Sequence, residues 1–240
     1  MLFSARHVSK SYLAGTPGCS AAARVLSRVN LELDAGAVTG VVGARGCGKT
    51  TLVRCVAGLA RPDAGALHWA PGAERPRIVS LAPAALPLET VEQVLARACA
   101  ELPVDSDCLD AVVSRLALEG LVDRTQAALT TDERARLALA IGLATRHPLL
   151  LLDGTADAIA ARARTLVREA LHRYAAEGGA VLLTGRDGDA VAALASATYR
   201  LCDGCLMPPP GGAERGHTAR VAERPPMSAP PAPPPPPAVR

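Results

Sequence analysis

The feature that most constrains this chain is the glycine-rich segment GARGCGKTT, which occupies residues 43–51. It matches the pattern G-x-x-x-x-G-K-[ST], in which glycines let the backbone wrap until successive N–H groups face phosphate oxygens. A buried-strand pattern, AVTGVVG, ends at Gly43, the first glycine of this segment. A helical pattern, TLVRCVAGLA, covers residues 51–60. A strand, a glycine loop and a helix in this order predict a nucleotide phosphate site in an α/β fold.

Each position in this segment has an expected role. Gly43, Gly46 and Gly48 let the backbone approach the phosphates. Lys49 is expected to bridge the β- and γ-phosphates, and the hydroxyl of Thr50 is expected to reach Mg²⁺. Lys49 is one of only two lysines among 26 basic residues, which makes its place in the pattern more informative. The residues predicted to contact ATP here are Gly43, Ala44, Arg45, Gly46, Cys47, Gly48, Lys49, Thr50 and Thr51.

Short apolar runs and helical patterns alternate along the rest of the chain. LLLL at residues 149–152 and AVLLTG at residues 180–185 predict buried strands. The segment at residues 88–102 predicts a helix whose threonine and glutamine have capping-box spacing. A second helix is predicted over residues 109–120, closing at its final glycine. This alternation indicates an α/β fold with a mostly parallel sheet covered by helices.

An acidic residue follows the leucine run directly. Asp153 ends a predicted buried strand, where its carboxylate fits the second acidic position that holds Mg²⁺ directly or through water. The alternative is that Asp153 caps the turn after the strand. We favour the metal role and predict Thr50 and Asp153 as the metal ligands. The next residue, Gly154, has no side chain to offer.

Charge and hydropathy argue against a nucleic-acid partner, a membrane-spanning helix and a secretory signal. The net charge of +3 is small and scattered, without a basic stripe interleaved with aromatic residues, so no nucleic-acid partner is expected. No window approaches 18 uninterrupted apolar residues, which argues against a membrane-spanning helix. The opening MLFSARHVSK has no apolar signal core, so we expect a cytoplasmic protein.

The cysteines and the prolines each carry a further expectation. The seven cysteines lack a disulfide-framework spacing, which fits a reducing compartment. Cys202 and Cys205 form a lone CxxC, which we interpret as chance rather than as a zinc site. From residue 207 onward the chain holds most of its prolines and few residues able to pack. Residues 207–240 are therefore predicted to be a disordered or polyproline tail, with a ligand for a proline-reading domain as the alternative.

Along residues 2–206 the chain resembles the ATP-binding domain of ABC transporters. FSARHVSKSY is similar to the opening strand of that family, with Tyr12 where an aromatic ring stacks on adenine. The run from RVLSRVNLELDAGAVTG to AGAL is similar to the family's stretch from the second strand through the phosphate loop. RLALEGLVDR is similar to part of its helical subdomain. LTTDERARLALAIGLATRHPLLLLDG resembles its signature region and second acidic strand. The switch strand and the last strands are matched by AVLLTGRD and YRLCDGCL.

This resemblance implies a P-loop NTPase fold of the ABC type, with ATP and Mg²⁺ as cofactors. It places the ATP-binding domain at residues 1–206 and a helical subdomain at about residues 86–128. The stretch between Tyr12 and Arg24 weakly resembles the branch associated with lipoprotein release and macrolide export.

Five functional positions of the family are changed in this chain. The glutamate that polarises the attacking water falls at Gly154, and the switch histidine falls at Arg186. The glutamine of the coupling loop falls near Pro83, and the aspartate after the second acidic strand falls at Ala160. The signature Leu-Ser-Gly-Gly-Gln/Glu falls on Leu129, Thr130, Thr131, Asp132 and Glu133.

These changes predict weak or absent hydrolysis. Gly154 cannot position water, and loss of a general base typically costs on the order of 10²–10⁴-fold in rate. Arg186 keeps a charge that can contact a γ-phosphate, but it cannot accept a proton as histidine does. No residue is therefore predicted to be catalytic.

The altered signature segment has two interpretations. Thr130 and Glu133 have capping-box spacing, so this helix start can satisfy its own N–H groups. Asp132, if it faced the triphosphate of a partner subunit, would set like charges against each other across the interface. We favour the capping role. In the head-to-tail dimer of the family, the changes would weaken both composite sites.

The resemblance also implies partners. We expect a separate membrane-spanning subunit, a homo- or heterodimer with another ATP-binding subunit, and a peripheral location at the inner face of the membrane. The alternative is a nucleotide-responsive binding or regulatory module outside any transporter. A third, less favoured hypothesis is a conventional ATPase with substituted catalytic groups.

Overall fold

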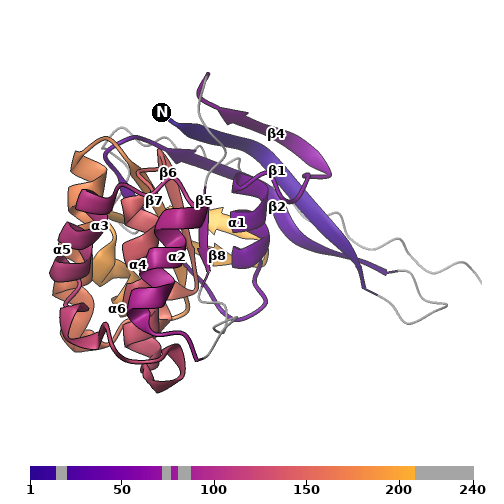
Figure 1. Ribbon diagram of the computed structural model, residues 1–240. Coiled ribbons are helices and arrows are strands. Elements are labelled where there is room, and N and C mark those ends of the chain that lie inside the picture. Colours follow the sequence, from indigo (N-terminus) through magenta and orange to yellow (C-terminus); the bar gives the residue numbers. More distant parts are fainter. Residues whose placement is uncertain (15–20, 72–76, 81–87, 209–240) are drawn as a thin grey trace, which may run out of the picture.

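The computed structural model describes residues 1–14, 21–71, 77–80 and 88–208 of the chain. Within these residues the strands form two sheets, one antiparallel and one mostly parallel (Figure 1). The position near Pro83 that replaces the coupling-loop glutamine lies outside the described residues, as does nearly all of the proline-rich tail. No helix of the described part is long and apolar enough to cross a bilayer.

The antiparallel sheet has the strand order β2-β1-β4. Its members are β1 (Phe3–Ala14), β2 (Ala21–Leu33) and β4 (Ala64–Trp69). Phe3 in the central strand β1 pairs with Leu33 on one side and Trp69 on the other. The long β1 and β2 extend beyond the body of the molecule as a two-stranded arm (Figure 1).

The larger sheet has the order β5-β6-β7-β3-β8-β9, and all its pairings except β8–β9 are parallel. Parallel strands present their carboxyl ends at one edge of a sheet, which is where ligands bind in open α/β folds. The strands are β3 (Val38–Val42), β5 (Arg77–Ser80), β6 (Leu149–Asp153), β7 (Ala180–Gly185), β8 (Ala197–Cys202) and β9 (Cys205–Met207).

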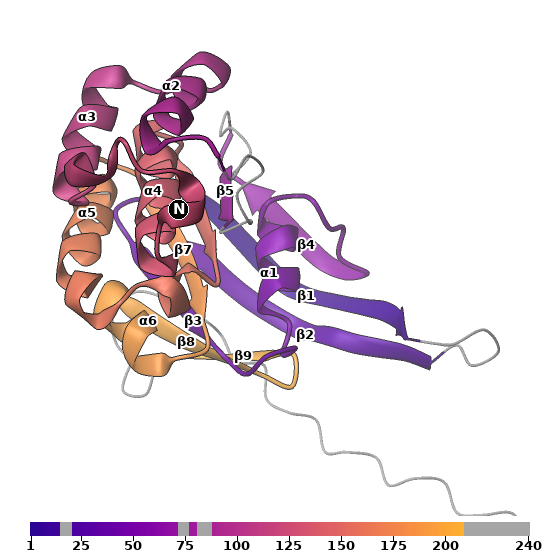
Figure 2. The same cartoon turned by 60° about the horizontal axis from the view of Figure 1, so that its bottom comes forward.

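The helices cover both faces of this sheet. The α-helices are α1 (Lys49–Val56), α2 (Val91–Glu101), α3 (Ser106–Arg115), α4 (Thr131–Ala144), α5 (Arg164–Ala176) and α6 (Gly188–Leu194). Short 3₁₀ turns are η1 (Glu119–Leu121), η2 (Gln126–Ala128), η3 (Thr155–Ala158) and η4 (Ala161–Ala163). Helix α1 lies between the two sheets, whereas α2 to α6 lie on the opposite side of the parallel sheet (Figures 1 and 2).

The strand β6 is apolar without alternation because both of its faces are buried. Leu150 and Leu152 pack in the core shared with the α2–α6 side. Leu149 and Leu151 pack in the second core, which contains α1 and the antiparallel sheet. All four are buried. Because both faces of the strand are covered, each side chain is removed from water, and the predicted buried strand is confirmed.

Several helix boundaries differ from the sequence prediction. Helix α3 begins after Asp105, whose side chain accepts the Cys108 N–H at 3.0 Å, and it ends at Arg115 rather than at Gly120. Ala117 has a left-handed φ of 50°, which stops the helix before the glycine is reached. Helix α1 similarly ends at Val56, earlier than the predicted residue 60.

Candidate functional site

The glycine segment connects β3 to α1 at the carboxyl edge of the parallel sheet. Gly46 and Gly48 have φ values of 81° and 109°, which side chains rarely adopt. A Cβ on Gly48 would also lie 2.8 Å from the carbonyl oxygen of Val25 in β2. Gly43 is equally constrained, because a Cβ there would lie 2.5 Å from both the Leu201 carbonyl oxygen and the Cys47 sulfur. The loop therefore needs glycine at these positions.

Lys49 is held in the middle of this loop. Its ammonium donates to the carbonyl oxygens of Gly43 and Ala44, both at 2.8 Å, and lies 3.7 Å from the Cys47 sulfur. The side chain is half-buried, so the cation is positioned by the loop rather than free in solvent. A fixed positive charge among backbone N–H groups suits a polyphosphate.

The start of α1 is open to an anion. Its N-cap, Gly48, offers no side-chain hydrogen bond, and the first turn contains no acidic residue. The first N–H groups of a helix lack partners within the helix and carry its positive dipole end. Thr50 is exposed at this end, and Thr51 is half-buried beside it. Ala44, Arg45 and Gly46 are exposed on the outer side of the loop.

Asp153 ends β6 at the same edge of the sheet. Its Oδ1 accepts the Thr184 hydroxyl at 2.9 Å, and the same Thr184 oxygen accepts the Gly154 N–H at 2.9 Å. This arrangement fixes the half-buried carboxylate between the ends of β6 and β7. A carboxylate and a hydroxyl are ligands that Mg²⁺ uses when phosphates and water complete its shell. The donor set of Thr50 and Asp153 therefore fits Mg²⁺.

Gly154 lies in a tight turn at the start of η3. Its φ of 71° and ψ of 3° are in the left-handed region, where glycine has no steric cost. Nothing lies within 4 Å of a Cβ built on this residue. The backbone conformation, and not lack of space, favours glycine here.

Arg186 follows β7 and pairs with Asp157 of η3. The Arg186 N–H and Nε donate to the two Asp157 oxygens at 2.7 and 2.9 Å, and the Asp187 N–H donates at 3.1 Å. Burial alone would raise the pKa of Asp157, but these hydrogen bonds outweigh it and lower the pKa. The guanidinium predicted to be able to reach a γ-phosphate is thus engaged by a carboxylate. Sequence analysis did not single out Asp157, because its partner is distant in the chain.

The signature segment forms the predicted cap of α4. The Thr130 hydroxyl accepts the Glu133 N–H at 3.2 Å, and the Glu133 carboxylate accepts the Thr130 N–H at 2.8 Å. The hydrogen bond from the Thr130 backbone is the main reason that the pKa of Glu133 is lowered. The capping box is confirmed, and the N–H groups it uses belong to the chain's own helix.

Asp132 agrees with the favoured capping interpretation. It does not face outward toward a partner's triphosphate, because it is only 6% exposed and its carboxylate turns into the protein. It pairs with Arg136 at 3.0 Å and accepts the Ala160 N–H at 2.8 Å. Arg136 in turn donates to the Leu116 and Ala117 carbonyl oxygens at the end of α3. The pair joins α4, α3 and the loop after β6.

Tyr12 lies on β1, with 41% of its surface exposed. The Lys10 ammonium lies 5.6 Å from its ring centroid. Tyr12 pairs with Ala23 of β2, two residues from the Val25 that touches the phosphate loop. The adenine-stacking role of Tyr12 stays a prediction.

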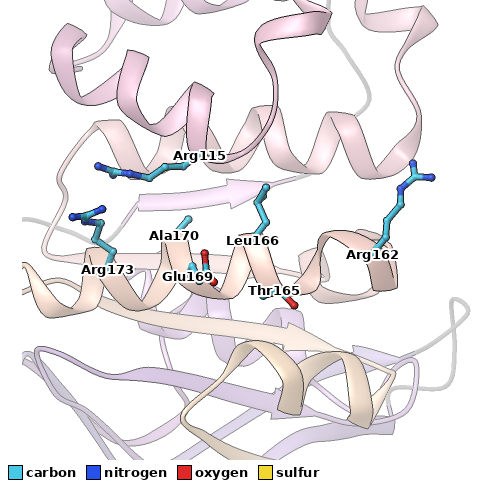
Figure 3. Close-up of a pocket in the computed structure, with 7 residues that line it drawn as sticks. All are labelled: Arg115, Arg162, Thr165, Leu166, Glu169, Ala170 and Arg173. Carbon is cyan, nitrogen blue, oxygen red and sulfur yellow. The ribbon is translucent and has the colours of Figure 1, made fainter.

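A separate cleft of about 460 Å³ lies between α3 and α5, on the helical side of the molecule (Figure 3). It contains none of the residues predicted to bind nucleotide. Its lining residues are Arg115, Arg162, Thr165, Leu166, Glu169, Ala170 and Arg173.

Comparison with known sequences gives a family match over much of this region. The model of the ABC transporter family matches residues 26–156, which includes the phosphate loop and Asp153. An aliphatic sulfonates import ATP-binding protein from Rhizobium johnstonii is 36% identical over 179 residues, covering 70% of this chain and 65% of that relative. A cytochrome c biogenesis ATP-binding export protein from Sphingopyxis alaskensis is 37% identical over 166 residues, covering 66% of this chain and 80% of that relative.

Comparison with solved structures gives the same fold. An ATP-binding subunit of an ABC transporter superposes with a TM-score of 0.70 at 19% identity, covering 86% of this chain and 88% of that one. A bacterial ABC transporter cassette solved as a dimer has a TM-score of 0.69 at 19% identity, covering 85% and 96%. The predicted α/β fold of the P-loop NTPase class is confirmed.

Proposed function

The chain belongs to the ABC transporter family of ATP-binding domains, and on this premise we propose that it binds Mg-ATP at its phosphate loop while hydrolysing it very slowly or not at all. The central observation is the loop itself. Lys49 is held on two loop carbonyl oxygens, and the start of α1 has neither a side-chain cap nor an acidic residue. Both features stabilise a polyanion there.

Specific residues would hold the nucleotide. We assign the phosphates to residues 43–51, with Lys49 between the β- and γ-phosphates, and the adenine ring to Tyr12. Mg²⁺ would be held by Thr50 and Asp153 and would neutralise charge on the phosphates. The domain assignment is residues 1–206 for the ATP-binding domain, with residues 207–240 as a tail.

Slow hydrolysis follows from what surrounds the γ-phosphate position. Gly154 has no carboxylate to orient water, and the Arg186 guanidinium is occupied by Asp157. Loss of a positioned general base typically lowers the rate on the order of 10²–10⁴-fold. Nucleotide binding does not depend on these groups, so binding and hydrolysis should separate in this chain.

For its partners, we propose a separate membrane-spanning subunit and a second ATP-binding subunit. A related cassette is a dimer. The capping box occupies N–H groups at the start of α4, and Asp132 is turned inward, so this segment has little to offer the nucleotide of a second subunit. We therefore favour a partner that does not depend on this segment for its own hydrolysis.

The decisive experiment measures ATP affinity and single-turnover phosphate release on the purified chain with Mg²⁺. Lys49→Ala should abolish tight binding, because the loop loses its only ammonium. Arg54→Ala is the matched control, since it removes an exposed cation from the same helix away from the loop. Binding without phosphate release in the unmodified chain is the expected result.

Two other outcomes would change the conclusion. Rapid phosphate release that depends on Lys49 would show that the chain is an active ATPase and that another group orients the water. Unchanged affinity in Lys49→Ala would remove the loop from the nucleotide site. Co-purification of the chain with a soluble protein, and with no membrane protein, would favour the regulatory module.

A further inference from the structure

Cys47 and the Cys202–Cys205 pair, which are far apart in the sequence, lie beside the phosphate loop. Cys47 lies inside the loop, whereas Cys202 and Cys205 end β8 and begin β9. The parallel pairing of β3 with β8 continues to Val42 and Arg200, which places the loop next to the end of β8. Figure 2 shows the β8–β9 hairpin beside β2, close to the strand that leads into the loop.

The hairpin holds its two cysteines directly opposite each other. Cys202 pairs with Cys205 across a two-residue turn, in which Asp203 and Gly204 have φ values of 48° and 74°. Such turns have left-handed conformations at both central positions. Directly opposed residues on antiparallel strands have Cα atoms about 4.5–5.5 Å apart and side chains on one face. A disulfide requires Cα atoms about 4.4–6.8 Å apart, so this pair meets the spacing.

The same hairpin is packed tightly against the loop. The Leu201 carbonyl oxygen, one residue before Cys202, leaves no room for a Cβ on Gly43. The Ser27 N–H of β2 donates to the Gly204 carbonyl oxygen at 2.8 Å. Val25 presents its carbonyl oxygen both to Gly204 of the turn and to Gly48 of the loop. A displacement of the hairpin would therefore act on the phosphate loop through these contacts.

We propose that Cys202 and Cys205 are a redox-sensitive dithiol, which a peroxide oxidises to an intrachain disulfide that weakens nucleotide binding at the adjacent loop. Both side chains are exposed, so the oxidant can reach them. The nucleotide part of this inference depends on the proposed function. The dithiol itself does not.

The chemistry balances with the peroxide as the only co-reactant. One thiolate attacks a peroxide oxygen and becomes a sulfenic acid, while the other peroxide oxygen leaves as water. The second thiol then attacks the sulfenic sulfur, forming the S–S bond and releasing a second water. The two sulfurs lose two electrons together, and hydrogen peroxide gains them. An exposed disulfide of this kind is labile, so a dithiol reductant should reverse it.

The charges around Cys202 set the pH at which it reacts. The Asp203 carboxylate raises the pKa of Cys202, first by its charge and then by accepting the thiol hydrogen bond at 3.6 Å. The Cys47 thiol raises this pKa further, whereas Arg200 lowers it. Because the thiolate is the reactive form, oxidation should accelerate as pH rises.

The first test treats the full chain with hydrogen peroxide and maps the cysteines by alkylation and mass spectrometry. Cleavage after Arg200 and Arg215 gives one peptide that contains Cys202 and Cys205 and no other cysteine. Cys47 falls in the short peptide of residues 46–49. The hairpin peptide should become resistant to alkylation and recover after reduction. A disulfide from Cys47 to either hairpin cysteine, or full alkylation after peroxide, would overturn the proposal.

The second test compares ATP affinity before and after peroxide. The unmodified chain should lose affinity and regain it on reduction, whereas Cys202→Ser and Cys205→Ser should keep the same affinity in both states. Cys99→Ser, which removes an exposed thiol of α2, should respond like the unmodified chain. A mapped disulfide without loss of affinity would overturn the coupling. Failure of the reduced chain to bind ATP would instead overturn the proposed function and the coupling, while the peptide map still decides the dithiol.

Discussion

Gly154 lacks the catalytic carboxylate expected at its position, and its left-handed backbone also favours glycine. The family resemblance predicts that a carboxylate is missing here, and the structure adds a left-handed turn with open space around it. Restoring glutamate would therefore supply the carboxylate but place it on a strained backbone. A gain in hydrolysis from Gly154→Glu would accordingly be partial.

The strain at Gly154 can be measured separately from the chemistry. Gly154→Ala should lower the free energy of unfolding by about 1–2 kcal/mol, because an L-residue at positive φ crowds its own carbonyl oxygen. Gly120→Ala is the matched control, since its Cβ also meets open space and its φ is not positive. It should be neutral or stabilising by up to about 1 kcal/mol. Equal effects in urea denaturation would contradict this explanation.

The burial of Asp132 could not be predicted from the sequence. Its spacing from Arg136 allows an i,i+4 ion pair, but such a pair is normally solvated. Burial depends on partners that no local pattern reveals, namely the Ala160 N–H and the carbonyl oxygens at the end of α3. The carboxylate lies inward, against the less favoured alternative, because these tertiary hydrogen bonds stabilise it there.

Breaking this buried pair should be costly. Asp132→Ala leaves the Arg136 guanidinium buried without its carboxylate, and removing one partner of such a pair costs about 3–5 kcal/mol of unfolding free energy. Asp110→Ala, an exposed aspartate of α3, should change stability by less than about 0.5 kcal/mol. Chemical denaturation followed by circular dichroism measures both. A loss below about 1 kcal/mol for Asp132→Ala would show that the pair contributes little.

At the scale of elements, the two capping boxes were predicted well and the helix boundaries less well. The boxes at Thr90 and Thr130 were both found, because a capping box is a local pattern within four residues. The end of α3 depended on Ala117, an ordinary residue whose left-handed φ is imposed by its surroundings. Buried strands were also predictable, since an unbroken apolar run needs no partner to be recognised.

The cap of α4 gives a pH-dependent prediction. Thr130→Ala should cost about 1 kcal/mol at neutral pH, and Thr131→Ala, also exposed, much less. The folded state lowers the pKa of Glu133, so its contribution is complete above the usual glutamate pKa of about 4.3 and is lost as pH falls through the lower folded value. Glu133→Gln cannot titrate and should lack this acid-dependent loss. The free energy of unfolding of the unmodified chain and of Glu133→Gln should be measured between pH 6 and about pH 2. Equal losses in the two proteins would contradict the prediction.

For the whole molecule, sequence predicted the fold class but not the long-range arrangement. The strand order, the antiparallel sheet around β1 and the Asp157–Arg186 pair all depend on residues distant in the chain. At the candidate site, the loop and Asp153 were recognisable from pattern. Their placement at one edge of the sheet, and the position of three cysteines beside it, could be seen only in the folded structure.

Slow turnover predicts a persistent effect of ATP on global stability. Ligand that binds only the folded chain stabilises it by about 2.7 kcal/mol at a concentration 100 times its Kd. The rise in Tm should therefore be the same when measured at once and after hours of incubation with Mg-ATP. Lys49→Ala should show no rise. A rise that decays as ADP accumulates would contradict weak hydrolysis, provided that ADP alone shifts Tm less.

Trp69 gives the chain a built-in optical reporter. It is the only tryptophan, and its indole N–H donates to the Val56 carbonyl oxygen at 3.2 Å, at the opposite end of α1 from Lys49. Its ring also packs beside Phe3, with ring centroids 5.5 Å apart. A helix of this length spans only about 12 Å, so it moves as a rigid rod. Intrinsic fluorescence, excited selectively at the indole, would therefore follow events at the phosphate loop without any added dye.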